Sequence, residues 1–193
     1  MNYQFTAEER KEIIALMNRE IVPAIGCTEP IAVALCVAKA TETLGCCPER
    51  IEARLSANVL KNAMGVGIPG TGMAGLPIAI ALGALIGKSG YQLEVLRDCT
   101  PEAVERGKKF IAQGGISIIQ DKEACDNLYV DVVCKKGNHR SEAIIAHEHT
   151  RLVYLCIDNN VMLDERSSLH KTSVGETDSD LTLRQVFDFA TQT

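Results

Sequence analysis

The stretch PAIGCTEPIAVAL, residues 23–35, places a short glycine-containing loop directly before a run of apolar residues. Thr28 is a suitable N-cap residue, and Glu29 and Pro30 are both favoured in the first turn of a helix. The pattern predicts a helix over residues 29–44 that ends at Gly45. Because this segment is apolar on nearly every side up to Ala38, we expect it to be a central, buried helix.

Three further helices are expected around this segment. Thr6 and Glu9 form a capping-box pattern before an amphipathic helix over residues 7–22. The sequence GLPIAIALGALIG, residues 75–87, predicts a second buried helix. TPEAVERGKKFIAQGG predicts an amphipathic helix that Thr100 caps and that ends before Gly114.

Period-two patterns predict the strands. One is expected over residues 50–57, ahead of the glycine-rich centre, and four follow the helix that Thr100 caps. These four expected strands cover residues 116–120, 127–136, 140–149 and 151–159. Because the turn KKGNH joins the second of them to the third, we expect an antiparallel meander.

The order of these elements favours an α+β fold, in which buried apolar helices pack on a largely antiparallel sheet. We expect residues 1–163 to form one α+β domain. Residues 164–193 are expected to form a polar linker and a short amphipathic helix, which either folds back onto the domain or leads into a part that is absent here.

Composition and charge exclude several classes of protein. The net charge of −5, with no dense cluster of Lys and Arg, argues against nucleic acid as a partner. The longest apolar run, residues 74–87, is too short to span a bilayer, and the charged opening does not resemble a signal peptide. The eight cysteines are scattered without a CxxC pair, which is typical of reduced thiols in a cytoplasmic protein.

The segment KNAMGVGIPGTGMAGLP, residues 61–77, matches GxGxxG twice. The match is weak evidence for a dinucleotide site, because the repeated β-α-β pattern of a doubly wound sheet is missing. A glycine loop before a helix also suits an anion such as a carboxylate, with Thr71, Lys61 and Asn62 as additional donors. A tight turn that needs glycine only for its backbone angles explains the pattern equally well.

Cys27 and two histidines are the remaining candidates for chemistry. A cysteine directly before a helix has its pKa lowered by the helix N-terminus, which suits either a nucleophile or a metal ligand. His149 is the histidine we would assign as a base for a nucleophilic Cys27. His147 and His149 would share one face of a strand, where a surface position is favoured over a metal site. The pattern leaves the chemistry of Cys27 open.

Two motifs together resemble a known family. PAIGCTEPIAVAL and NVLKNAMGVGIPGTGMAGLPIAIALGALIG are similar to the N-terminal half of the L-cysteine desulfidases, which are related to the alpha subunit of iron–sulfur L-serine dehydratases. The likeness extends to the terminal LTLRQVFDF and covers essentially the whole chain. It implies a lyase with a [4Fe-4S] cluster that converts L-cysteine to pyruvate, ammonia and sulfide. L-serine is the alternative substrate.

The resemblance also implies roles for particular residues. Cys27, in the GCTEP motif, would be a ligand of the cluster, and the other cysteine ligands would lie in the missing C-terminal half. The candidates for catalysis are Lys61, Asn62 and His149. The candidates for substrate binding are Thr28, Glu29, Gly70, Thr71 and Gly72. The family often has His-Thr-Asn where this chain has His149-Thr150-Arg151, which puts a role at that position in doubt.

The expected partners follow from the same resemblance. They are an amino-acid substrate and the C-terminal half of the same enzyme, while nucleic acid and membrane are not expected. Homo-oligomerisation is left open. We expect this chain alone to carry no cluster and to be inactive. Two other hypotheses are a small-molecule binding domain without enzymatic activity and a hydrolase or transferase with Cys27 as the nucleophile.

Overall fold

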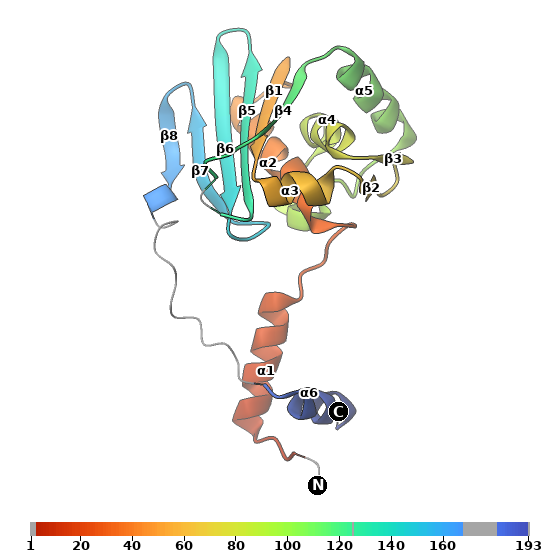
Figure 1. The fold of residues 1–193 in the computed structure, drawn as a ribbon, viewed down its shortest axis with the longest axis vertical. Helices are drawn as coiled ribbons and strands as arrows, with labels where there is room; N and C mark the ends of the chain where they lie inside the picture. Colours follow the sequence, from red (N-terminus) through yellow and green to blue (C-terminus); the bar gives the residue numbers. More distant parts are fainter. Residues whose placement is uncertain (1–2, 125, 168–180, 193) are drawn as a thin grey trace. The chain divides into compact units, whose positions relative to one another are not determined.

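The computed structural model describes residues 3–124, 126–167 and 181–192 (Figure 1). Contacts within the chain define two compact units, one of residues 23–171 and one that combines residues 1–22 with residues 172–193. The first helix therefore groups with the last one. This grouping differs from the sequence-based division at residue 163, which assigned the first helix to the larger domain.

The larger unit contains a six-stranded mixed sheet in the order β4-β1-β5-β6-β7-β8. The strands are β1 (Arg50–Leu55), β4 (Ile116–Gln120), β5 (Tyr129–Lys136), β6 (His139–Ala146), β7 (Leu152–Ile157) and β8 (Asn160–Asp164). All neighbouring strands are antiparallel except β1 and β4, which are parallel. The largely antiparallel α+β fold is therefore confirmed, with a C-terminal meander of β5 to β8.

Two details of the predicted meander are wrong. The segment 116–120 forms β4 at the edge of the sheet. It pairs in parallel with β1, from which α3, α4 and α5 separate it in the chain. The fourth strand of the meander is β8, which the sequence analysis missed. β8 is an edge strand with mostly exposed side chains, so it lacks the alternation of buried and exposed residues that identifies a strand.

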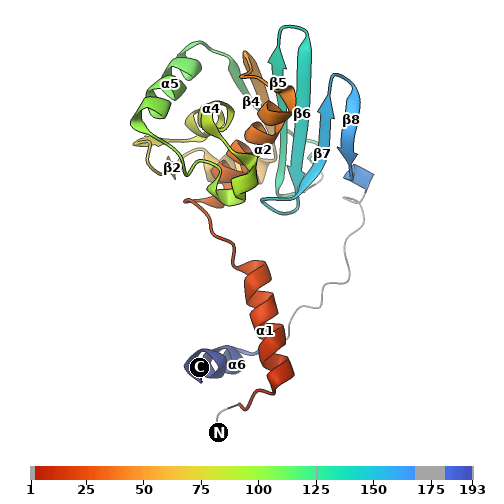
Figure 2. The same ribbon diagram turned by 180° about the vertical axis from the view of Figure 1, so that it is seen from behind.

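The helices of the larger unit lie on one face of the sheet (Figure 2). They are α2 (Thr28–Leu44), α3 (Ala57–Ala63), α4 (Leu76–Ile86), the short 3-10 segment η1 (Ser89–Glu94) and α5 (Pro101–Ala112). The view shows α2 in front of β5 and β6, with α4 and then α5 further from the sheet. The helix bounds confirm the prediction that α2 and α4 are buried and apolar.

Helix α2 is the centre of the core. Its residues from Ile31 to Ala38 are all at most 1% exposed. The Cys36 thiol donates to the carbonyl oxygens of Val130 and Ala143, on two adjacent strands. On its other side α2 approaches α4 so closely that a Cβ atom at Gly83 would lie 2.6 Å from the Ala34 carbonyl oxygen. Glycine at this position therefore sets the distance between the two buried helices.

The structure corrects the predicted beginning of α2 and fills in the glycine-rich centre. Cys27, with an extended backbone, is the N-cap residue, and Thr28 already belongs to the helix. Residues 58–74 were left without elements, yet α3, which begins at Ala57, and a small hairpin of β2 (Gly67–Ile68) and β3 (Met73–Ala74) lie there. Two-residue strands are too short to give a periodic signal in the sequence.

The smaller unit consists of α1 (Ala7–Glu20) and α6 (Leu183–Thr191), each of which begins with a capping box. The Tyr3 backbone N–H donates to the Asp188 carboxylate over 2.7 Å. The rings of Phe5 and Phe189 pack edge to face at a centroid distance of 5.5 Å. These contacts join two segments from opposite ends of the sequence.

None of the helices in the described residues is long and apolar enough to cross a membrane.

Candidate functional site

Three of the predicted site residues donate hydrogen bonds to the carboxylate of a fourth, Glu29. The Cys27 thiol donates to Glu29 Oε2 over 3.0 Å, and the Thr28 hydroxyl donates to the same oxygen over 3.3 Å. The other oxygen, Oε1, accepts from Asn62 Nδ2 at 3.1 Å. The two segments that the resemblance marked, GCTEP and LKN, are therefore connected directly through one carboxylate.

Local sequence places these groups. The carboxylate of Glu29 lies in the first turn of α2, where the helix dipole favours a negative charge. Helix α3 begins directly after β1, and the Ser56 side chain caps it by accepting from the Val59 N–H. This short connection places α3 beside the N-terminal end of α2, where Asn62 contacts Glu29.

His149 also belongs to this group. It lies in the connection between β6 and β7, and its charge helps to lower the pKa of Glu29. The prediction that His147 and His149 share a strand face is wrong, because β6 ends at Ala146 and His147 has a left-handed backbone with φ of 68°. His147 instead places Nδ1 2.5 Å from Asp126 Oδ2.

The electrostatics of Cys27 differ from the expectation for a cysteine at a helix start. The hydrogen bond to Glu29 raises the pKa of the Cys27 thiol, and partial burial acts in the same direction. The same hydrogen bond is the main cause that lowers the pKa of Glu29. The neutral thiol facing a carboxylate is therefore the stable pair, and the predicted lowering of the pKa of Cys27 by the helix N-terminus is wrong.

The glycine-rich loop lies against the loop that carries Cys27. A Cβ atom at Gly26 would come within 2.7 Å of Pro69 Cγ, so only glycine permits this approach. Gly26 also has φ of 86°, which favours glycine independently. The sequence analysis did not single out Gly26. A glycine directly before the cysteine was the available signal, but its partner Pro69 is distant in the chain.

The three loop residues proposed for substrate binding sit at the tip of the β2–β3 hairpin. Gly70 and Gly72 have left-handed backbones, with φ of 76° and 63°. The Thr71 hydroxyl accepts from the Met73 N–H at 3.0 Å and lies 2.6 Å from the Ile68 carbonyl oxygen, to which it donates. The Thr71 side chain therefore stabilises the turn, and the Thr71 N–H is also used within it, where it donates to the Ile68 carbonyl oxygen over 3.2 Å.

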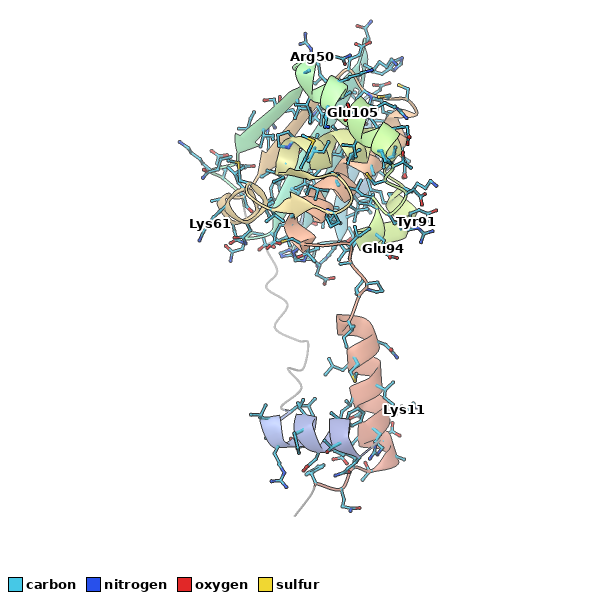
Figure 3. The ribbon with its side chains drawn as sticks, turned by 90° about the vertical axis from the view of Figure 1, so that its right-hand side faces the viewer. Lys11, Arg50, Lys61, Tyr91, Glu94 and Glu105 are labelled. Atoms are coloured by element: carbon cyan, nitrogen blue, oxygen red, sulfur yellow. The ribbon has the colours of Figure 1, made fainter. Side chains whose placement is uncertain are left out.

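The dinucleotide interpretation of this loop is not supported by its context. Helix α3 separates β1 from the glycines, and a hairpin of two-residue strands, β2 and β3, precedes α4. The fingerprint requires a strand that leads directly through the glycine turn into a helix. Lys61, the remaining predicted residue, is exposed on α3, and its side chain points outward in Figure 3.

The fit to a metal cluster depends on Cys27. Within residues 3–124, 126–167 and 181–192, no three His, Cys, Asp or Glu side chains are grouped so that they would hold a metal ion. Cys27 is partly exposed, whereas Cys36 is fully buried behind it in α2. The described residues thus suit one thiolate ligand at the surface, and further ligands would have to come from elsewhere.

Comparison with curated proteins finds relatives that are all named UPF0597 proteins. The chain is 59% identical over 182 residues to one from Bacteroides thetaiotaomicron and 60% identical over 185 residues to one from Bacteroides fragilis. A relative from Porphyromonas gingivalis is 41% identical over 189 residues. These matches cover 94%, 96% and 95% of this chain but only 42%, 43% and 44% of the relatives.

The chain therefore spans less than half the length of the curated relatives it matches. No family model matches the sequence, and no solved structure matches it. The relatives' shared name states no activity, so the function has to be argued from the site itself.

We expect the Glu29 carboxylate to control how fast Cys27 reacts with an alkylating reagent. Glu29→Gln removes the carboxylate whose hydrogen bond, together with its charge, raises the pKa of the Cys27 thiol, so more of the thiol is ionised at neutral pH. We expect alkylation of Cys27 by iodoacetamide to become about three- to tenfold faster. Mass spectrometry of the modified peptides measures this rate, with the exposed Cys46 as an internal standard.

Glu123→Gln is the matched control, since Glu123 is an exposed carboxylate far from Cys27 in the sequence. It should leave the labelling rate of Cys27 unchanged. Equal rates in Glu29→Gln and the unmodified protein would show that the carboxylate does not control the thiol.

Proposed function

We propose that this chain is the N-terminal part of a [4Fe-4S]-dependent lyase that degrades L-cysteine to pyruvate, ammonia and sulfide. The observation that carries the proposal is the meeting of two sequence motifs. The GCTEP loop and the PGTGM loop contact each other at Gly26 and Pro69, and Glu29 connects Cys27 to Asn62. Both motifs are the ones through which the chain resembles cysteine desulfidases.

Cys27 would hold one iron of the cluster, and the other ligands would come from the part of the protein that lies outside this chain. When bound, the cluster supplies a Lewis acid for the leaving group of the substrate. To become a ligand, the Cys27 thiol gives up its proton. Glu29 already accepts a hydrogen bond from that thiol, so the proton has an acceptor in place.

The other residues of the site bind and orient. Asn62 and Thr28 donate to the Glu29 carboxylate and fix its position beside Cys27. The backbone N–H groups of Gly70 and Gly72 suit the carboxylate of an amino acid, since both glycines have left-handed backbones in this turn. His149, whose charge helps to lower the pKa of Glu29, is the candidate for a base. Lys61 is exposed and has no assigned contact with this group.

L-serine dehydration is the alternative activity, because loss of hydroxide or of sulfide from the β-carbon needs the same groups. A third possibility, for these 193 residues by themselves, is a small-molecule binding domain that uses the glycine loop and has no enzymatic activity. We place the longer protein in the cytoplasm, where its thiols stay reduced.

The test uses a full-length chimera, in which these 193 residues replace the matched part of the Bacteroides thetaiotaomicron relative. After anaerobic reconstitution, we expect the chimera to bind iron and sulfide and to release sulfide from L-cysteine. Cys27→Ser should lower both cluster content and activity by at least about tenfold, the range seen for weaker perturbations of metal sites.

Cys46→Ser is the matched control, because Cys46 is an exposed thiol outside the site. It should retain the cluster and the activity. A reconstituted chimera without iron would contradict the proposal, and so would a Cys27→Ser variant that keeps its iron. Release of ammonia from L-serine in the absence of sulfide release from L-cysteine would favour the dehydratase instead.

A further inference from the structure

The smaller unit buries too little apolar surface, among its described residues, to be stable by itself. Among its described residues the single fully buried one is Asp188, and no large apolar side chain is buried. A pair of short helices is marginal in water unless an apolar face is covered by tertiary packing. The unit is held by polar contacts and by the packing of Phe5 on Phe189, with Arg10 5.6 Å from the Phe189 ring centre.

Each helix of this unit presents an exposed apolar stripe. On α1, Ile14 and Met17 lie about one turn apart, and the C-cap residue Ile21 follows one turn after Met17 and is 66% exposed. On α6, Leu183 and Phe187 lie one turn apart with Val186 beside them, and Leu183 is 86% exposed. Single exposed apolar residues are ordinary, but two stripes on two contacting helices indicate a binding surface.

The length of the relatives indicates what covers these stripes. Proteins 59–60% identical to this chain carry more than half of their length outside the match. A segment in the same polypeptide is present at a high effective concentration, which favours it over a separate partner. A second copy of the chain is the competing occupant and would cover the stripes only at sufficient concentration.

We propose that the two stripes of α1 and α6 form a docking surface for an apolar, helical segment from the part of the longer protein that lies outside these 193 residues. The surface is defined by Ile14 and Met17 on α1, by Ile21 at the C-cap of α1, and by Leu183, Val186 and Phe187 on α6. It contributes to assembly of the two parts of the protein. The inference is independent of the reaction, because it uses none of the residues around Glu29.

The experiment uses the full-length chimera with a protease site at each border between the matched part and the rest. The protein folds as one chain and is cleaved afterwards. Size-exclusion chromatography then shows whether the pieces remain together. We expect the unmodified pieces to stay associated, and Val186→Ser with Phe187→Ser to weaken association at least about tenfold, since two exposed apolar contacts are lost.

Val161→Ser with Met162→Ser is the matched control, because these side chains on β8 are 50% and 60% exposed in the other unit. This control should stay associated. Phe187→Leu keeps an apolar side chain at the stripe and should also stay associated, which separates loss of contact from loss of α6. Far-ultraviolet circular dichroism before cleavage confirms that each variant retains its helices.

Three outcomes would overturn the proposal. The pieces of the unmodified chimera would separate, the stripe variant would remain as tightly associated as the control, or the control would separate as readily as the stripe variant. Sedimentation of this chain alone tests the second copy. A concentration-dependent dimer that Val186→Ser with Phe187→Ser abolishes would assign the stripes to self-association instead.

Discussion

Replacing Gly83 with valine is expected to destabilise the larger unit by about 3 kcal/mol, at the upper end for an overpacked core. A Cβ atom at this position would lie 2.6 Å from the Ala34 carbonyl oxygen, and 3.1 Å from the Ala34 Cα atom. Both atoms belong to the backbone of α2, so no side chain can rotate away. The helices would have to separate along a fully buried contact.

The sign of the effect makes this prediction specific. Replacing glycine inside a helix normally adds up to about 1 kcal/mol of stability, because glycine is a poor helix former. A loss at Gly83 therefore reports the close approach of α4 to α2. Urea unfolding followed by circular dichroism measures the difference in free energy.

Gly67→Val serves as the matched control for this measurement. Gly67 lies in β2, where a branched side chain is acceptable, and a Cβ atom there would meet no other atom within 4 Å. We expect a change of at most about 0.5 kcal/mol. If Gly83→Val unfolded at the same urea concentration as this control, the packing of α2 on α4 would be looser than the structure shows.

Asp131→Asn is expected to stabilise the protein at pH 8 by about 2–4 kcal/mol and to have little effect at pH 4, on the scale of about 1.4 kcal/mol per pKa unit. Asp131 lies in β5 and is 5% exposed. Burial is the main cause that raises the pKa of its carboxyl group to about 7, and the neighbouring charge of Glu142 adds to it. Arg54 and Arg140 act in the opposite direction.

The direction of the pH dependence follows from this raised pKa. Below the unfolded pKa, near 4, the carboxyl group is neutral in both states and folding has no ionisation cost. Between about pH 4 and pH 7 the Asp131 carboxyl group is ionised in the unfolded chain but stays protonated in the folded protein. The stability of the unmodified protein therefore falls as pH rises. Asparagine cannot ionise, so the stability difference between the two proteins grows over this window.

The local geometry gives the Asp131 carboxylate no close partner that would stabilise its negative charge among the described residues. Asp131 Oδ1 is buried and has no hydrogen-bond partner among the described residues. The guanidinium of Arg54 lies 3.8 Å from Oδ2, which is too far for a close ion pair. Unfolding curves recorded at several pH values between 4 and 8 measure the effect.

Asp98→Asn is the control with the opposite sign, because a hydrogen bond from Lys88 lowers the pKa of this exposed carboxyl group. Its contribution to stability is present above the unfolded pKa and is lost as pH falls. Asp98→Asn should therefore destabilise slightly at neutral pH. Parallel pH profiles for the unmodified protein and Asp131→Asn would contradict the raised pKa of Asp131.

Local signals in the sequence predicted the regular elements well. The helix α5 begins where Thr100 was expected to cap it, and the Thr100 hydroxyl accepts from the Ala103 N–H at 3.2 Å. The same holds for Thr6 at the start of α1. The KKGNH turn joins β5 to β6 as predicted. In each case the atoms that define the element lie within a few residues of one another.

The candidate site was predicted as a list of residues but not as an arrangement. Cys27, Thr28 and Glu29 are adjacent in sequence, so their proximity was known. Their contact with Asn62 and the nearness of His149 depend on where α3 and the connection after β6 lie. His147 was misplaced because the strand pattern continued in sequence past the point where pairing stops at Ala146.

The sequence alone determined the α+β class, the two buried helices and the position of a thiol at a helix start, because apolar periodicity and capping are local properties. The tertiary structure decided three things: the parallel pairing of β4 with β1, the contact of Gly26 with Pro69, and the raised pKa of Cys27. The first two join groups that are far apart in the chain. The third depends on the direction in which the Glu29 side chain points, and a sequence does not encode that direction locally.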